Sequence, residues 1–429
     1  MNAAANRSPD VVADAGALQR RLGVSDAVVI GAGSMIGAGV FAAWAPAAGA
    51  AGSGLLIGLG IAALVAFCNA ASSAQLAAVH PESGGTYVYG RRQLGDGWGH
   101  LAGWGFVVGK VASCAAMAMT VGAYLWPERE RAVAVAAVVA ITVVNVGGLN
   151  RTVAVTRILL VVSLTVLAAV VVAGWSSPDA DLGRLTPVEG GPLGIVRSAG
   201  FLFFAFAGYA RIATLGEEVR EPGTTIPKAI PRALLVVLAV YTAVGVTALA
   251  TVDSALLAGS DAPLRLVASA GPIDAGGIVR FGAGVAALGA MLNLIPGVSR
   301  TALAMARQRE LPGWLAHIEP QRSLPVRAEL CVAAVVVTIV AVVDLRNAIA
   351  ISGVAVLTYY AVTNAAALTL TSEQRRWSPT ISVVGLVGCI ALIASLPPTA
   401  IVAGTATLVV GVVVRAITTR GTTRSGEWR

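Results

Sequence analysis

Charged residues are scarce in this chain. Of its 429 residues only 12% are Asp, Glu, Lys or Arg, whereas an ordinary soluble domain carries about 25%. The 22 acidic and 30 basic side chains are too few to form a charged shell around a water-soluble globule of this size. The 56% of apolar residues suffice for about twelve spans of roughly 20 residues. The composition therefore excludes a soluble globule and indicates a polytopic helical membrane protein.

Cysteine and histidine are also rare, with four and three residues respectively. The cysteines lie far apart within apolar runs, which excludes a disulfide framework and a closely spaced metal site. We expect them to be buried free thiols: Cys68, Cys114, Cys331 and Cys389. The histidines lie singly near the ends of apolar runs, where we expect solvated side chains and no metal: His80, His100 and His317. No cofactor is expected.

Three other signatures are missing. The apolar runs are continuous and lack the alternating polarity of transmembrane strands. Residues 1–21 are polar and the next apolar run is too long for a secretory signal, so we expect the first span to remain in the mature protein. No nucleophile, base and orienting partner stand out together, so an enzyme is not predicted.

Apolar runs between charged or Pro/Gly-containing segments predict twelve membrane helices. Runs six and eight contain charged or proline interruptions, so eleven or thirteen spans also remain open. The predicted ranges are 26–50, 54–79, 98–125, 132–149, 155–175, 193–215, 229–251, 278–306, 326–343, 347–370, 380–396 and 399–414.

The distribution of basic residues predicts the orientation of these spans. If the N-terminus is cytoplasmic, 21 of the 30 basic residues fall on the cytoplasmic side, seven fall outside and two lie within spans. This bias follows the preference of Lys and Arg for short cytoplasmic loops. We therefore expect a plasma-membrane protein with both termini in the cytoplasm. The net charge of +8 then needs no nucleic-acid partner.

Glycine interrupts two of the predicted spans. The first contains Gly31, Gly33, Gly37 and Gly39, and the sixth contains Gly208 within an aromatic run. Each glycine weakens a helix by about 1 kcal/mol relative to alanine. The two spans are five apart, and an odd repeat must be inverted when it recurs in the membrane. Discontinuous helices in two inverted halves are predicted, although glycines spaced by four also permit close helix packing alone.

An unwound membrane helix leaves peptide groups without intrahelical partners. A half-helix N-terminus offers N–H donors with a positive dipole end, and the other half offers carbonyl acceptors. A zwitterionic amino acid fits this arrangement. We expect its carboxylate at the N–H groups of Gly37 to Gly39 and its ammonium at carbonyls of both broken spans.

Four segments in order resemble the amino acid/polyamine/organocation (APC) permease superfamily. They are GAGSMIGAGVF at 31–41, PESGGTYVYG at 81–90, FFAFAGYARIATLGEEVREPGTTIPKAIP at 203–231 and SRTALAMARQRELP at 299–312. The resemblance covers most of the chain through the tenth span. It implies an inverted five-plus-five helix fold of the LeuT type with discontinuous helices 1 and 6, alternating access, and transport of amino acids or polyamines.

The resemblance also implies the substrate contacts. They fall on Met35, Ile36, Gly37, Ala38 and Gly39 in the first span, and on Phe206, Ala207 and Gly208 in the sixth. Ala38 departs from the Ser or Thr common in the family, so one hydroxyl for the carboxylate is missing. Ala210 stands where an acidic residue is frequent. Ser163 stands nearest to the span-five lysine of proton-coupled relatives, which argues against coupling by that route.

Lys110 lies near the middle of the third predicted span, where a charge costs at least a few kcal/mol and usually marks function. We interpret it as a proton-coupling candidate or as a partner of the substrate carboxylate. A structural lysine that binds unwound carbonyls of span one is the alternative. Arg211 is interpreted as structural, extending towards Glu217 and Glu218. Tyr359 and Tyr360 are interpreted as packing residues, with gating as the alternative.

These observations give a domain organisation and a function. We expect a cytoplasmic segment at 1–25, a first repeat at 26–175, a second at 193–370, helices 11 and 12 at 380–414 and a cytoplasmic tail at 415–429. The predicted function is a proton-coupled secondary active permease that imports or exchanges amino acids. A cationic amino acid or polyamine exchanger is the alternative within transport. A channel or a membrane receptor would be a different class.

Overall fold

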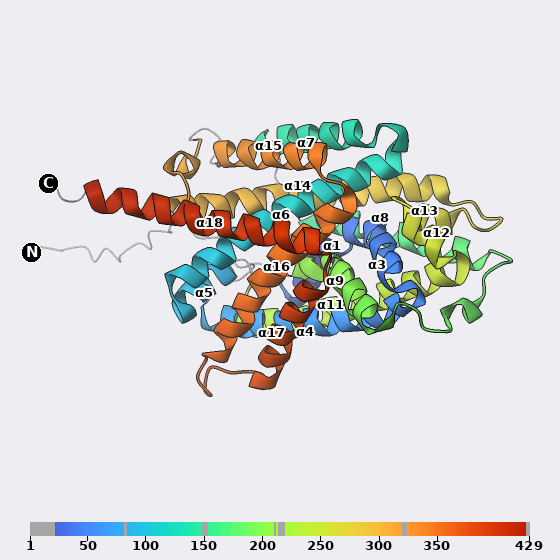
Figure 1. Cartoon of the computed structure of the whole chain (residues 1–429), viewed down its shortest axis with the longest axis horizontal. Helices are drawn as coiled ribbons and strands as arrows, with labels where there is room; N and C mark the ends of the chain where they lie inside the picture. The colour runs from blue at the N-terminus through green and yellow to red at the C-terminus, as the bar shows by residue number, and fades with distance from the viewer. Residues whose placement is uncertain are drawn as a thin grey trace, which may run out of the picture.

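The computed structural model describes residues 22–80, 84–147, 153–209, 212, 219–319 and 324–425. In this part of the chain every extended element is a helix, and the only β structure is two isolated bridges. Long helices lie side by side along the longest axis of the molecule (Figure 1). Most backbone polar groups are therefore bonded within their own helix, which is what a hydrocarbon environment requires.

The helices of the first half are α1 (Val24–Met35), α2 (Ala38–Ala42), α3 (Trp44–Ala51), α4 (Leu55–Val79), α5 (Thr86–Leu94), α6 (Asp96–Leu125), α7 (Glu130–Val146), α8 (Val153–Trp175) and α9 (Gly191–Phe206). Those of the second half are α11 (Pro222–Thr251), α12 (Ser254–Gly259), α13 (Pro263–Ala268), α14 (Gly276–Arg307), α15 (Val326–Val342), α16 (Leu345–Leu368), α17 (Pro379–Ser395) and α18 (Pro398–Ser425). Short 3₁₀ turns are η1 (Gly52–Gly54), η2 (Pro127–Arg129), η3 (Leu182–Leu185), η4 (Ala207–Tyr209) and η5 (Gly313–Ala316).

Each of the twelve predicted spans contains helix among its described residues, although the first is divided into α1, α2 and α3. Nine helical stretches of the described residues are long and apolar enough to cross a membrane. The other three predicted spans correspond to α7, α15 and α17, which have 17 residues each, the short end of the spanning range of about 17–25. The chain is thus a polytopic membrane protein whose described residues are helical apart from turns and connections.

The helices differ in how much of their apolar surface the bundle covers. In the most apolar stretch of α6, and likewise in that of α16, 78% of the residues are buried within the bundle. In α18 only 17% of them are buried. Large side chains such as Phe281 and Val342, each 73% exposed, face outwards from their helices. An outward-facing apolar surface suits contact with lipid, so α6 and α16 form the centre and α18 lies at the periphery (Figure 1).

Small residues allow the central helices to approach closely. A Cβ atom built on Gly109 of α6 would lie 2.7 Å from Val356 Cγ2 of α16, and one on Gly105 would lie 3.1 Å from the Ala355 carbonyl oxygen. This contact follows the small-residue packing typical of membrane helices. It fixes the position of Lys110, the residue after Gly109.

The first predicted span is discontinuous. α1 ends at Met35, and α2 begins at Ala38 after Ile36 (φ −79°, ψ 67°) and Gly37 (φ −124°, ψ −145°), both outside the helical region. The sixth predicted span also changes form, because α9 ends at Phe206 and gives way to η4. The first span is thus interrupted where the glycines predicted it, and in the sixth the α-helix ends inside the predicted range.

The two ends of the bundle carry different elements. α5 and the C-terminal part of α18 lie at one end, here named the α5 end, and α12 and α13 lie at the other (Figure 1). All four cysteines are unpaired, as predicted, but Cys331 is only half-buried.

Candidate functional site

The break in the first span creates free peptide groups inside the bundle. Gly37 N–H bonds back to the Met35 carbonyl oxygen at 2.8 Å instead of continuing the helix. The first N–H groups of α2, from Ala38 onwards, have no intrahelical acceptor, as at any helix start. Ala38 and Gly39 are buried, so these donors lie within the protein and away from solvent.

The two broken segments cross each other in opposite directions. A Cβ on Gly39 would lie 2.6 Å from Ala205 Cα, and one on Gly208 would lie 2.1 Å from the Ser34 carbonyl oxygen. From Ser34 to Gly39 along the first span, the neighbouring residues of the other run backwards from Gly208 to Ala205. Only glycine fits at both crossing points without a shift of the neighbouring backbone, so packing requires these two glycines.

A tyrosine hydroxyl bridges the two breaks. Tyr241 Oη of α11 lies 2.8 Å from the Met35 carbonyl oxygen and 3.1 Å from that of Ala205. Its ring packs edge-on against Phe206, with centroids 5.2 Å apart. One buried hydroxyl thus serves a carbonyl from each broken helix. Any movement of one segment against the other changes this contact.

The carbonyl of Ala207, in the 3₁₀ turn that follows α9, is a second point where side chains bind the backbone of these segments. Lys110 Nζ of α6 donates to it at 3.1 Å, and Tyr360 Oη of α16 donates at 3.3 Å. Lys110 is 6% exposed. Three roles for Lys110 were considered from the sequence, and the structure places its amino group on a carbonyl of span six rather than of span one.

The structure brings the predicted substrate contacts together. Met35, Ile36, Ala38, Phe206 and Ala207 are at most 5% exposed, and Gly208 is half-buried. Ser163 lies on α8 and donates to the Leu159 carbonyl of its own helix at 2.9 Å. Two further predictions lie outside the described residues: the missing carboxylate at Ala210 and the structural role of Arg211 with Glu217 and Glu218.

Sequence reasoning missed the tyrosines that hold the broken segments. Tyr241 and Tyr124 were not singled out, and Tyr360 was interpreted as a packing residue. Tyr124 Oη donates to the Phe41 carbonyl of α2 at 2.8 Å and accepts from the Leu264 backbone N–H at 3.2 Å. A usable signal existed, because a lone tyrosine within an apolar span needs a partner for its hydroxyl.

The histidine prediction fails at one position. His100, expected to be solvated, is only 1% exposed and faces the buried carboxylate of Glu310 at the α5 end. Its exposure could not be read from the sequence, because residues distant in the chain cover it. Tyr87, outside the spans, donates to the same carboxylate at 2.8 Å. Burial and the neighbouring Glu310 charge raise the pKa of Tyr87, so its hydroxyl remains a donor at physiological pH.

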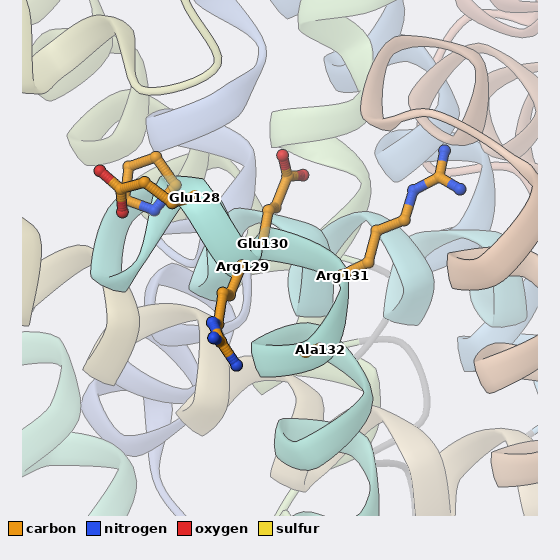
Figure 2. A pocket seen from close by; sticks show the side chains of 6 residues that line it. Glu128, Arg129, Glu130, Arg131 and Ala132 are labelled. Atoms are coloured by element: carbon orange, nitrogen blue, oxygen red, sulfur yellow. The ribbon is translucent and has the colours of Figure 1, made fainter.

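A surface depression at the connection between α6 and α7 does not belong to this site. It is lined by the consecutive residues 127–132, and Figure 2 shows Glu130 and Arg129 pointing away from each other. Ligand sites gather groups from several elements, which this single turn does not do.

Comparison with known proteins assigns the architecture to a group of transporters. The family model described as amino acid permease matches residues 22–421. An uncharacterized transporter of Mycobacterium tuberculosis is 58% identical, over 94% of this chain and 93% of its own length. The branched-chain amino acid permease BcaP of Bacillus subtilis is 28% identical over 72% and 71%. A methylthioribose transporter of the same bacterium is 26% identical over 72% of each chain.

Proposed function

The chain belongs to the amino acid permease family, and from this premise we propose that it is a secondary active carrier of amino acids that works by alternating access. The observation that supports this most directly is the antiparallel crossing of two broken segments at Gly39 and Gly208. Peptide donors at the start of α2 and carbonyls of both segments lie around this crossing, which is what a zwitterion needs.

The proposed site has a donor side and an acceptor side. The substrate carboxylate binds the free N–H groups at the start of α2, at Ala38 and Gly39, where the helix dipole favours negative charge. The ammonium binds carbonyls of the unwound segments, those of Met35, Ala205 and Ala207. Tyr241, Tyr360 and Lys110 occupy these carbonyls in the structure. Binding therefore exchanges side-chain donors for the substrate ammonium.

Lys110 is the proposed coupling residue. Its amino group bonds to the same Ala207 carbonyl that the substrate ammonium would use. The two positive groups then compete for one acceptor, so substrate binding favours loss of the lysine proton. This link gives proton coupling without a lysine at Ser163.

The proposed topology is twelve crossings with inverted repeats at 26–175 and 193–370. The match of all twelve predicted spans to helices supports it, as does the opposite direction of the two broken segments. The bias of basic residues supports cytoplasmic termini and a location in the plasma membrane, with residues 380–414 as helices 11 and 12. Residues 1–25 and 415–429 would flank the bundle in the cytoplasm.

Counterflow in proteoliposomes tests the proposal. Vesicles containing the purified protein are preloaded with unlabelled leucine and diluted into labelled leucine, with arginine and methylthioribose in parallel. We expect saturable, stereoselective accumulation of a neutral amino acid. Accumulation of arginine alone would favour the cationic exchanger. Accumulation of methylthioribose alone would exclude a site that depends on a carboxylate and an ammonium.

Two other outcomes would exclude a carrier mechanism. Non-saturable flux that is insensitive to preloading would identify a channel. Binding without flux would identify a receptor. A matched variant, Gly60→Ala, controls for protein handling, because Gly60 is exposed on α4 and a Cβ there meets nothing within 4 Å.

A further inference from the structure

A buried polar cluster lies at the α5 end, away from the broken segments. At its centre is Glu310, which follows α14 and is 3% exposed. Tyr87 and Arg91 of α5 donate to its two oxygens at 2.8 and 3.1 Å. His100 of α6 faces it with Nδ1 at 3.5 Å from Oε2. The cluster connects elements from three distant parts of the sequence.

The hydrogen on the imidazole can be placed from its other contact. His100 Nε2 lies 2.9 Å from the Gly411 carbonyl oxygen of α18, and a carbonyl oxygen only accepts. Nε2 therefore carries a hydrogen. In a neutral ring Nδ1 is then an acceptor, and it faces a carboxylate oxygen that is also an acceptor. Nδ1 is buried and has no hydrogen-bond partner in the part of the chain that the structure describes.

A single additional proton removes the repulsion between these two facing acceptors. Bound to Nδ1 or to Oε2, it converts two facing acceptors into a donor and an acceptor in a buried setting. Arg91 does not do this, because its single charge is shared between Glu310 and Asp96, which lies 3.0 Å from it. Tyr87 already uses its only hydrogen on Oε2. Two further basic residues lie at this end of the bundle: Arg415 of α18, whose guanidinium lies beside Gly97, and Arg309, which directly precedes Glu310.

We propose that His100 Nδ1 and Glu310 Oε2 form a buried site for one proton. When the proton is bound, it stabilises the contact between α6 and the segment after α14, and with it the packing of α5 and α18 against them. The proton site stands on this geometry alone. A role of this site in transport rests on the function proposed above. With the proton bound, the helices at the α5 end stay packed together, and loss of the proton weakens this packing.

Thermal unfolding against pH tests the site without any substrate. The full-length protein in detergent is compared between pH 5.5 and 8.5 with His100→Gln, Glu310→Gln and the double variant. The proposed shared proton exists only where Nδ1 and Oε2 face each other in the folded protein, so the proposal predicts that wild-type stability rises as pH falls. We expect this pH-dependent shift of the midpoint, about 2 °C or more, to disappear in both single variants. The double variant should show no further loss.

Controls make each outcome decisive. His317→Gln removes an exposed histidine in the same inter-helix connection and should retain the wild-type profile. Parallel profiles for wild type and Glu310→Gln would overturn the proposal, and so would a flat profile for His317→Gln.

If a variant does not fold, hydrogen exchange of the wild type decides. Corrected for intrinsic rates, protection of residues 96–104 and 404–415 should increase at low pH relative to α4, and equal changes would refute the site. If neither the wild type nor any variant shows counterflow, the proposed transport function is refuted. The pH dependence of the thermal midpoint, which tests the proton site, is independent of that outcome.

Discussion

Lys110 Nζ donates to the carbonyl oxygen of Ala207 at 3.1 Å, so a side chain from the middle of α6 holds the peptide group that directly follows the end of α9. This contact joins a predicted coupling residue to a predicted substrate-binding residue. It makes the structural and the coupling roles of Lys110 separable by experiment.

Substitution of Lys110 distinguishes these roles. Lys110→Gln retains a donor for Ala207 but cannot be charged, whereas Lys110→Ala loses both properties. If the lysine couples protons, both variants lose uptake driven by a pH gradient by at least about tenfold, the loss expected for a charge-assisted bond of roughly 1.5–3 kcal/mol. Uptake is measured in proteoliposomes across a range of external pH.

The other lysine of the chain supplies the control. Lys228→Gln removes an exposed lysine near the start of α11 and should leave the pH profile unchanged. If Lys110→Gln retains wild-type uptake at every pH and only Lys110→Ala fails, the residue holds the break and does not couple.

Tyr241 should stabilise the two breaks. Tyr241→Phe removes the hydroxyl shared by the Met35 and Ala205 carbonyls, and loss of such a hydrogen bond costs about 0.5–1.5 kcal/mol. We expect a lower thermal midpoint and weaker substrate protection in a stability assay. Tyr89→Phe serves as the comparison, since Tyr89 stacks on His80 away from the breaks. Equal midpoints for the two variants would contradict the assigned role.

Gly208 and Gly60 should respond oppositely to the same change. Alanine at Gly208 places a Cβ 2.1 Å from the Ser34 carbonyl oxygen, a backbone atom, and overpacking of this kind costs about 1–3 kcal/mol. Alanine at Gly60, in the interior of α4 with open space around it, should stabilise by up to about 1 kcal/mol. Midpoints measured in detergent check the signs. A Gly208→Ala protein as stable as wild type would mean that the segments do not cross here.

Arg309 adopts a left-handed conformation after α14, with φ +58°. The N–H groups of Arg309 and Glu310 bond back to the carbonyls of Ala306 and Met305, a helix ending in which glycine is preferred. Arg309→Gly should therefore raise stability, by about 1 kcal/mol. Arg307→Gly, the same change at the last residue of α14, should lower it by a similar amount. A lower midpoint for Arg309→Gly than for wild type would contradict this assignment.

Particular residues show how far the sequence could lead. The run of glycines from Gly31 to Gly39 predicted a break, and the structure places it at Ile36 and Gly37. Lys110 stood out because a charge in an apolar span is costly. The partner of Lys110 could not be predicted, since Ala207 is 97 residues away.

Burial errors had the same origin. His100 was expected to be solvated because it lies close to the end of an apolar run. Glu310 and Gly411 cover it, although both are more than 200 residues away in the chain. Local pattern gives no information about such contacts.

The sequence by itself determined the helical membrane architecture and the places where two helices break, because hydrophobicity and glycine content act on each segment independently of the others. Only the tertiary structure decided which groups satisfy the broken segments: Tyr241, Tyr360 and Lys110 for the carbonyls, and the pairing of His100 with Glu310 at the α5 end. A freed peptide group or a buried side chain needs some partner, and which residue supplies it depends on how the helices pack.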